Sequence, residues 1–346
     1  MATIRDVAKM AKVSISTVSL AFNEGARVSV ETRKKVLDAA KNVGYAPNPL
    51  AQNLKRGHAR LIGVVLGDVT NPFFGHLLKE IERLALESNH LVIMCNSDAD
   101  PARELAILSH LEAQRVAGVI LSPHGHHPQY VEALQKFEMP IVTIDQKIKD
   151  LDVDYVASDN LLTGAMQTEH VIRFGHKRIA HIGGIKELWT ATQRLQGFYS
   201  TMQAAGIEID ESLVVEGHYD GQCAYECTLR LLIRPDRPTA IIAASNVMAL
   251  GALKAINDLG FKCPDDISLV SVDDVPWSEV IQPSITTVKQ EIDDIARIAT
   301  ESLMNRINNR TGPALNHRDH ILTPKLVIGQ SCAAPPVEGA NLSSGY

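Results

Sequence analysis

The chain has 346 residues, 45% of them hydrophobic and 21% charged, a composition typical of a folded protein with two or three domains. No apolar run reaches the roughly 18 residues that a membrane span needs, and the N-terminus lacks the apolar core of a secretory signal peptide. The five cysteines are widely scattered, which argues against a disulfide framework and favours a reducing, cytoplasmic setting.

Charge is distributed unevenly along the chain. Residues 1–60 contain eleven Lys and Arg against four Asp and Glu, a formal charge of +7, which leaves −13 on the rest of a chain whose net charge is −6. A basic segment on an acidic body suggests that the segment contacts a polyanion such as nucleic acid. A solvated surface with a chance excess of Lys is the alternative.

Two short helices are predicted within the first 22 residues. Residues 4–11 place apolar side chains at the i, i+3, i+4, i+7 spacing of an amphipathic helix, and Thr3 stands where an N-cap belongs. Residues 11–13 interrupt this pattern. Ser14 can cap a second helix, whose core-facing residues are Val18, Ala21 and Phe22.

A third helix completes a helix-turn-helix pattern. Ser29 can cap it, Glu31 suits its first turn and Gly44 ends it. Two short helices joined by a tight turn, with a third that closes the core, present the outer face of the second helix to the DNA major groove. A plain three-helix bundle is the alternative, which the charge of +7 disfavours. The outer face carries Ile15, Ser16, Thr17 and Leu20.

Residues 45–60 connect this basic head to the body. Asn48 can cap a short helix that has Pro49 at its first position and runs to about Arg56. A helix of about eight residues is not stable alone in water, so we expect order here only with a partner. Leu54 is an apolar side chain in a basic segment, which suits a base stack or a protein interface. A flexible linker with an incidental Leu is the alternative.

The body alternates apolar runs with helical patterns, which predicts parallel sheets covered by helices on both faces. The number of strands favours two doubly wound α/β lobes, about 61–158 and 160–287, with helix 290–309 returning to the first lobe and strands near 320–328 finishing the body. The strand-like runs are 61–66, 90–95, 117–121, 141–144, 178–182, 239–243 and 267–272, and the helical patterns are 74–89, 101–115, 160–174, 190–205, 221–233, 245–259 and 290–309.

Ligands of such sheets bind at the carboxyl ends of the strands, in the cleft between lobes. The residues that follow the predicted strands combine flat aromatic faces with Arg and Asp, which hold a polyhydroxylated or heterocyclic small molecule in fixed geometry. For Phe73 or Tyr219 taken alone, core packing is the equal alternative. These cavity candidates are Asp68, Asn71, Phe73, Phe74, Ser122, Pro123, His124, Asp145, Trp189, Thr190, Arg194, Tyr219, Ser245, Asn246, Asp273 and Asp274.

Motifs over nearly the whole chain, residues 2–330, resemble the lactose/galactose repressor (LacI/GalR) family of bacterial regulators. They include TIRDVAKMAKVSISTVSLAFN, IGVVLGDVTNPFF, FGHKRIAHIGG, QRLQGF, PDDISLVSVDD and PSITTV, in that order. The resemblance implies a helix-turn-helix domain (1–46), a hinge helix (47–60) and a periplasmic-binding-protein-like body (61–332). It also implies lobe 1 at 61–158 plus 288–318, lobe 2 at 160–287 plus 319–332, and a disordered tail at 333–346.

The same resemblance implies a transcriptional repressor that binds a palindromic operator as a homodimer under the control of a small sugar-like effector. Ligand closure of the lobes would shift the dimer geometry and permit or melt the hinge helices, in which Leu54 would wedge into the minor groove. The expected DNA-binding residues are Thr3, Ser14, Ile15, Ser16, Thr17, Ser19, Leu20, Asn23, Tyr45, Asn48, Ala51, Leu54 and Lys55.

The expected effector contacts combine family positions with the strand-end rule. The family places contacts at positions that match Phe73, Phe74, Thr190, Arg194, Tyr219 and Asp273, and the strand ends add His124, Trp189, Ser245 and Asn246. Ser245-Asn246 stands where the family more often has Asn-Asp.

Two positions in the head also depart from the family pattern. Leu20 replaces the common Arg or His, which would bond guanine edges, so the resemblance does not define the preferred operator half-site. Lys12 replaces the usual Gly of the turn, which costs on the order of 1 kcal/mol if the turn needs a positive φ.

No catalytic constellation is found. There is no Walker loop, and Cys223 and Cys227 lack a nearby Cys/His pair for zinc. A solvated loop is a better interpretation of His124, His126 and His127 than a metal site. We therefore expect no enzyme, no metal and no cofactor beyond the effector. A transporter's solute-binding protein and a sugar-processing enzyme are the alternatives. Residues 333–346 lack leucine heptads, which predicts a dimer and not a tetramer.

Overall fold

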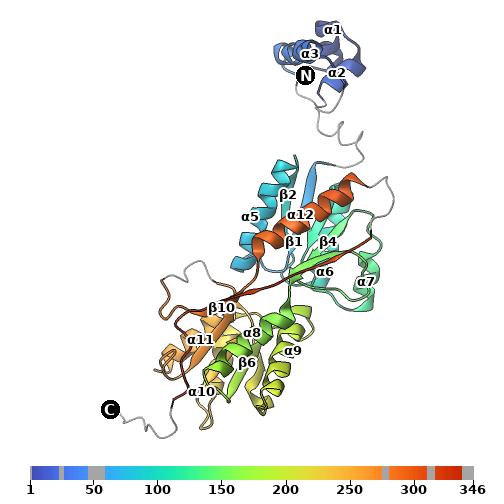
Figure 1. Cartoon of the computed structure of the whole chain (residues 1–346). Helices are drawn as coiled ribbons and strands as arrows, with labels where there is room; N and C mark the ends of the chain where they lie inside the picture. Colours follow the sequence, from blue (N-terminus) through green and yellow to red (C-terminus); the bar gives the residue numbers. More distant parts are fainter. Residues whose placement is uncertain (1, 23–26, 46–58, 275–279, 310–315, 337–346) are drawn as a thin grey trace. The chain divides into compact units, whose positions relative to one another are not determined.

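The computed structural model describes residues 2–22, 27–45, 59–274, 280–309 and 316–336. The chain divides into two compact units, residues 1–60 and 61–346, and each is described separately below. The first unit contains the predicted head, and the second contains both lobes of the body (Figure 1).

The head contains the three predicted helices, α1 (Ile4–Ala11), α2 (Ile15–Ala21) and α3 (Val30–Val43). Ser14 caps α2 by accepting a hydrogen bond from the Thr17 N–H at 3.0 Å, and Ser29 caps α3 through the Thr32 N–H at 3.2 Å. The apolar stripes of the helices meet in one small core, whose fully or nearly fully buried residues are Val7, Ala8, Ala11, Val18, Ala21, Val36, Ala39 and Ala40.

The turn between α1 and α2 has the left-handed conformation suggested by the sequence. Lys12 is the C-cap of α1 at φ 52° and ψ 46°, and the Val13 N–H donates to the Ala8 carbonyl at 3.1 Å. This conformation brings the Cβ of a non-glycine residue too close to the following carbonyl. The head therefore carries backbone strain at Lys12.

The first lobe is a six-stranded parallel sheet in the order β11-β5-β4-β3-β1-β2. Helices α5 (Pro72–Glu87) and α12 (Ile292–Asn308) pack on one face, and α6 (Pro101–Ala113) and α7 (Pro128–Leu134) cover the other. Figure 1 shows α12 beside α5, as the sequence predicted for the returning helix. The strands are β1 (Leu61–Leu66), β2 (Leu91–Asn96), β3 (Gly118–Leu121), β4 (Ile141–Ile144), β5 (Asp154–Ser158) and β11 (Asp319–Leu322).

The second lobe repeats this plan with the order β12-β10-β9-β8-β6-β7, in which only the β10–β12 pair is antiparallel among the described strands. Helices α8 (Asn160–Arg173) and α9 (Trp189–Ala204) cover one face, and α10 (Gly221–Leu232) and α11 (Asn246–Asp258) the other. The strands are β6 (Ile179–Gly183), β7 (Val214–Glu216), β8 (Ala240–Ala243), β9 (Ser268–Val272), β10 (Thr286–Lys289) and β12 (Lys325–Val327).

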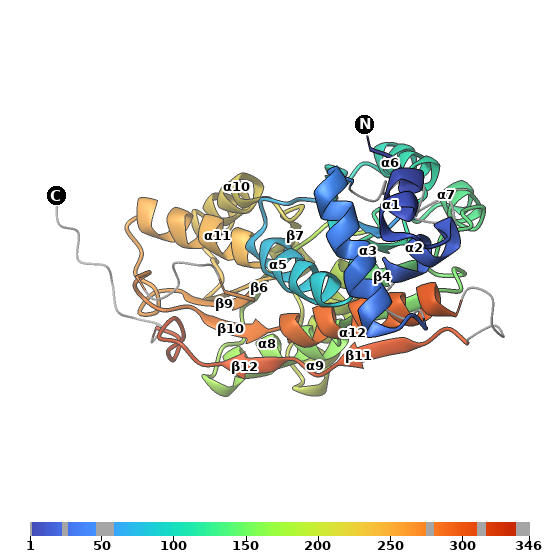
Figure 2. The same cartoon turned by 90° about the horizontal axis from the view of Figure 1, so that it is seen from above.

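Three short connections join the lobes, and two of them correct predicted boundaries. The chain crosses after β5, after β10 and between β11 and β12, which follow one another along one extended stretch (Figure 2). Residues 319–322 therefore belong to the first lobe and not to the second, because β11 pairs with β5 from Asp319 to Leu322. Residues 288 and 289 belong to the second lobe and not to the first, because they lie in β10, which pairs with β9 and β12. The apolar pattern of these few residues does not reveal which sheet they join.

The tail prediction is wrong at its first residue. The Ala333 N–H donates to the Ser268 hydroxyl at 3.0 Å, and the Ala333 carbonyl lies 2.8 Å from the His176 Nε2. Ala333 is thus hydrogen-bonded to the second lobe. Residues 337–346 lie outside the described part of the chain. In that described part, we find no helix with the length and apolar character of a membrane span.

Candidate DNA-binding head and effector cavity

The predicted recognition face of α2 is open to solvent. Ile15 is 46% exposed and Leu20 is 41% exposed, although both are apolar. The Ser14 and Thr17 hydroxyls lie 2.8 Å apart at the start of the helix. Exposed apolar side chains beside small hydroxyls suit contacts with thymine methyl groups and phosphates.

The remaining predicted DNA contacts have different positions. Ser16 is exposed and Ser19 is partly exposed on α2. Thr3 precedes α1, where both its N–H and its hydroxyl bond the Asp6 carboxylate at 2.8 Å. Tyr45 packs against Phe22 with ring centroids 6.0 Å apart, so it helps to close the head core. The predictions for Asn23, Asn48, Ala51, Leu54 and Lys55 lie outside the described residues.

A cavity of about 360 Å³ lies between the lobes, at the carboxyl ends of the strands of both sheets. This size falls within the range of small-molecule pockets. Nine of the ten predicted effector contacts line it, namely Phe73, Phe74, His124, Thr190, Arg194, Tyr219, Ser245, Asn246 and Asp273.

Trp189 is the exception, and its assignment to the cavity is wrong. It is the first residue of α9, is 38% exposed and does not line the cavity, whereas its neighbours Leu188 and Thr190 do. Successive helical residues point in directions about 100° apart, so they cannot all face one cavity. The sequence identified the segment but not the register of its first turn.

Arg194 is a buried cation held by its own lobe. Its Nε donates to the Asn160 Oδ1 at 2.8 Å, and its Nη1 donates to the Ala244 carbonyl at 2.6 Å. Gly164 on α8 makes this approach of helices possible, because a Cβ there would lie 2.0 Å from the Arg194 carbonyl. The guanidinium is thus fixed in orientation beside the cavity, as a specific hydrogen-bond donor must be.

Two carboxylates, one from each lobe, line the same cavity. Asp273 follows β9 and accepts hydrogen bonds from the Gln290 N–H at 2.9 Å and the Gln290 Nε2 at 2.7 Å. Asp145 follows β4 and accepts one from the Gln146 Nε2 at 2.9 Å. Burial raises the pKa of both carboxyls, and the Arg194 charge opposes that rise.

Backbone strain is concentrated at this cavity. Six of the lining residues have a left-handed φ between 53° and 62° without being glycine. Such conformations cost on the order of 1 kcal/mol each and persist only where the surrounding structure holds them. Strain of this kind is typical of ligand sites. The six residues are Asp98, Ala99, Asp145, His218, Tyr219 and Asp273.

His124 reaches the cavity from a buried polar cluster in the first lobe. Its ring lies over Gly67, where a Cβ would be 2.1 Å from the His124 Cε1. Its Nδ1 is 3.0 Å from the Ser122 carbonyl and 3.6 Å from the Glu104 carboxylate. Glu104 also accepts a hydrogen bond from the Tyr130 hydroxyl, and burial raises its pKa.

Sequence reasoning missed several residues that line the cavity. Gln146 directly follows the candidate Asp145, and Gln290 follows β10, which was not predicted as a strand. The short strands β5, β7 and β10 and the helix α7 were also missed. Asp98 and His218 stand at the ends of β2 and β7, so the strand-end rule would have found His218 had β7 been predicted.

The cysteine pair and the histidine run form local hydrogen bonds. The Cys223 and Cys227 thiols both donate to the Glu216 carbonyl, at 3.6 and 3.4 Å. The His127 Nδ1 accepts a hydrogen bond from the Tyr130 N–H at 3.1 Å and so caps α7.

A basic head with an exposed helix-turn-helix face, joined to a two-lobed body with a central ligand-sized cavity, defines a DNA-binding transcriptional regulator. Residues 3–48 match the bacterial regulatory proteins of the lacI family, and residues 168–332 match a periplasmic binding protein-like domain. The chain belongs to the lacI family of bacterial regulatory proteins, whose members are DNA-binding regulators and not enzymes.

Relatives that align over nearly their whole length support this assignment. The chain is 33% identical to the HTH-type transcriptional repressor PurR of Histophilus somni (strain 129Pt), over 96% of this chain and 99% of that protein. It is also 33% identical to the ribose operon repressor of Escherichia coli (strain K12), over 94% of this chain and 98% of that protein.

Solved structures share the same architecture. The lac repressor dimer bound to operator and the anti-inducer ONPF superposes with a TM-score of 0.84 at 26% identity, over 96% of this chain and 99% of that chain. The transcriptional regulator CelR in complex with cellobiose superposes with a TM-score of 0.72 at 27% identity, over 96% of this chain and 100% of that chain.

Proposed function

We propose that this protein is a repressor that binds a palindromic operator as a homodimer and responds to a small, sugar-like effector in the cavity between its lobes. The observation that carries the proposal is the fixed set of donors and acceptors around that cavity: Arg194, Asp145, Asp273 and the Tyr219 hydroxyl, beside the Phe73 and Phe74 rings. Hydroxyl groups of a sugar can both donate to the carboxylates and accept from the guanidinium.

The relatives support the effector class. One is named for the ribose operon, and one related structure contains cellobiose. We infer the domain limits 1–46 and 47–60 for head and hinge, a cytoplasmic location beside the DNA, and no cofactor other than the effector. The lac repressor dimer on its operator supports assembly as a dimer.

Thermal-shift screening of the full chain tests the effector assignment. The probes are D-ribose, D-xylulose, D-glucose, cellobiose and a set of nucleobases, each over a range of concentrations. A ligand that binds only the folded state raises the melting temperature by mass action, and the proposal predicts this for at least one sugar. The Asp273→Asn variant should lose that rise. An equal rise in wild type and variant would show that the ligand binds elsewhere.

A further inference from the structure

One pair of side chains joins the lobes across the cavity. Gln146 follows β4 in the first lobe and is 4% exposed, and Thr190 lies in the first turn of α9 in the second lobe and is 2% exposed. The Thr190 N–H donates to the Gln146 Oε1 at 3.2 Å, and the Gln146 Nε2 donates to the Thr190 Oγ1 at 2.8 Å. Each residue is therefore both donor and acceptor to the other.

The orientation of the Gln146 amide is fixed by its partners. The second Nε2 proton goes to the Asp145 carboxyl oxygen, and the Thr190 N–H can only donate. A flipped amide would place its oxygen against the Asp145 carboxylate and its NH₂ group against an N–H. On the other side, the Thr190 hydroxyl lies 2.7 Å from the Tyr219 hydroxyl, so a chain of hydrogen bonds runs from one lobe into the other.

The uncapped N-terminus of α9 also favours the Gln146–Thr190 hydrogen bonds. Thr190 is the second residue of α9, and the first N–H groups of a helix have no acceptor within it. Leu188 stands at the N-cap and provides no side-chain hydrogen bond. The Gln146 carbonyl oxygen therefore fills the role that an N-cap side chain has elsewhere, but does so from the opposite lobe.

We propose that Gln146 is a positioning residue that latches the lobes together before any effector binds. A cavity of about 360 Å³ remains beside the formed latch, so the latch leaves room for an effector. The effector-free body is biased toward the closed arrangement, so binding does not have to bring the lobes together from an open form. This inference rests on the proposed function only in identifying the cavity as the effector site.

Hydrogen–deuterium exchange of the full chain, without effector or DNA, tests the latch. The Gln146→Ala variant removes both cross-lobe hydrogen bonds, and each such bond contributes about 0.5–1.5 kcal/mol. Loss of the two bonds together corresponds to a roughly 5- to 150-fold decrease in the ratio of closed to open molecules. The peptide that contains Thr190 should therefore exchange about one additional amide at short times. The Thr190→Val variant, which keeps only the N–H bond to the Gln146 Oε1, should show a smaller gain.

The matched control is Gln135→Ala in the first lobe, where an exposed amide bonds only the Asp150 carbonyl. Small-angle scattering on the same samples separates lobe opening from a purely local loss of the helix cap. The radius of gyration should rise in Gln146→Ala and not in Gln135→Ala.

Unchanged exchange at Thr190 in both latch variants would overturn the proposal, as would faster exchange with an unchanged radius of gyration. Neither measurement uses an effector, so failure of the latch and failure of the sugar assignment remain distinguishable. If Gln146→Ala does not fold, Thr190→Val alone decides the outcome in the same two measurements.

Discussion

Arg194 and Asp273 line the same cavity from the second lobe, and the Arg194 charge counteracts the rise that burial imposes on the Asp273 pKa. Each side chain is nevertheless held by other groups: Arg194 by Asn160 and the Ala244 carbonyl, Asp273 by Gln290. The two side chains are thus positioned independently beside the space that a ligand would fill.

Asp273→Asn should weaken effector binding about 10- to 150-fold, because a hydrogen bond to a charged group contributes about 1.5–3 kcal/mol. Calorimetric titration measures this effect. The neighbouring Asp274→Asn is the matched control, since Asp274 bonds Thr287 and Lys289 and does not line the cavity. Operator binding without effector should persist in both variants. Wild-type effector affinity in Asp273→Asn would mean that the site is wrongly assigned.

Lys12→Gly should stabilise the head. The left-handed conformation costs a non-glycine residue about 1–2 kcal/mol, and glycine gives back about 0.4–1 kcal/mol through its freer unfolded chain. The net gain, centred on about 0.8 kcal/mol, should raise the melting temperature of the head transition by roughly 3–6 °C in calorimetry of the full chain. Lys12→Ala removes the charge and keeps the Cβ, so it should give no such gain. Equal stabilisation by both variants would assign the effect to charge.

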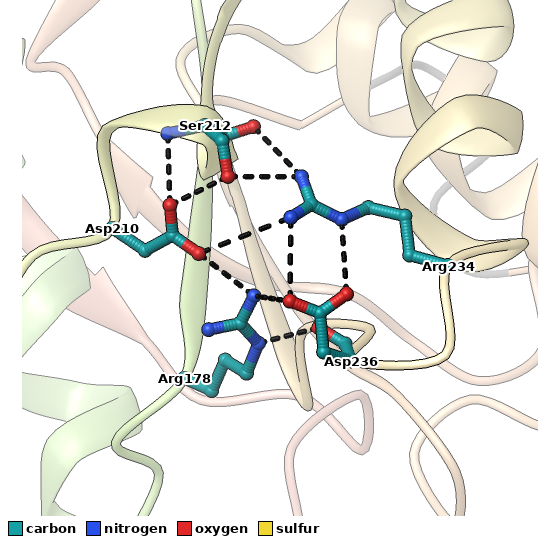
Figure 3. A network of polar contacts seen from close by, with 5 residues as sticks. All are labelled: Arg178, Asp210, Ser212, Arg234 and Asp236. Carbon is teal, nitrogen blue, oxygen red and sulfur yellow. Dashed lines mark hydrogen bonds and ion pairs between the residues drawn. The ribbon is translucent and has the colours of Figure 1, made fainter.

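The ion-pair network at the amino ends of β6, β7 and β8 should make the second lobe sensitive to acid. Figure 3 shows Arg178 between Asp210 and Asp236, with Arg234 on Asp236 and Ser212. Hydrogen bonds from Ser212 and Arg178 lower the pKa of Asp210 to about 2.

Because the folded pKa of Asp210 lies below its unfolded value, its contribution is present above about pH 4 and is lost as the pH falls toward 2. Asp210→Asn should therefore lower the melting temperature at pH 7, with a difference from wild type that shrinks below pH 4. The exposed Asp265→Asn is the control. A difference that stays constant between pH 7 and pH 2.5 would contradict this prediction.

Leu20→Arg should change operator preference. Leu20 is exposed on the recognition face and offers only apolar contact, whereas Arg forms paired hydrogen bonds with the guanine O6 and N7. The variant should favour a G·C pair at the contacted position by about 1–3 kcal/mol, measured by competition between operators that differ at one base pair. A uniform gain in affinity for every sequence would show that the Arg contacts only phosphate.

Most of the fold could be predicted because its patterns are long and regular. The caps Ser14 and Ser29, the stripe of α3 and the apolar runs of β1 and β8 each carry their own signal. The strand-end rule then placed twelve of its sixteen candidates around one cavity, because parallel strands bring their carboxyl ends together. The four candidates that do not line the cavity are Ser122, Pro123, Trp189 and Asp274.

The errors occurred where the local sequence does not determine the outcome. Strand β7 is three residues long, and residues 319–322 are assigned to a sheet only by their partner β5. Trp189 was misplaced because the register of a first helical turn depends on its tertiary contacts. Gln146 was missed because its role depends on Thr190, 44 residues away in the other lobe.

Binding of the full chain to DNA selected from a random pool tests the central claim most directly. The account predicts a two-fold symmetric sequence bound by the full chain, no sequence-specific binding by a chain that begins at residue 61, and an affinity that changes when the effector found by thermal shift is added. Sequence-specific binding retained by the truncated chain, or an operator affinity indifferent to that effector, would contradict it.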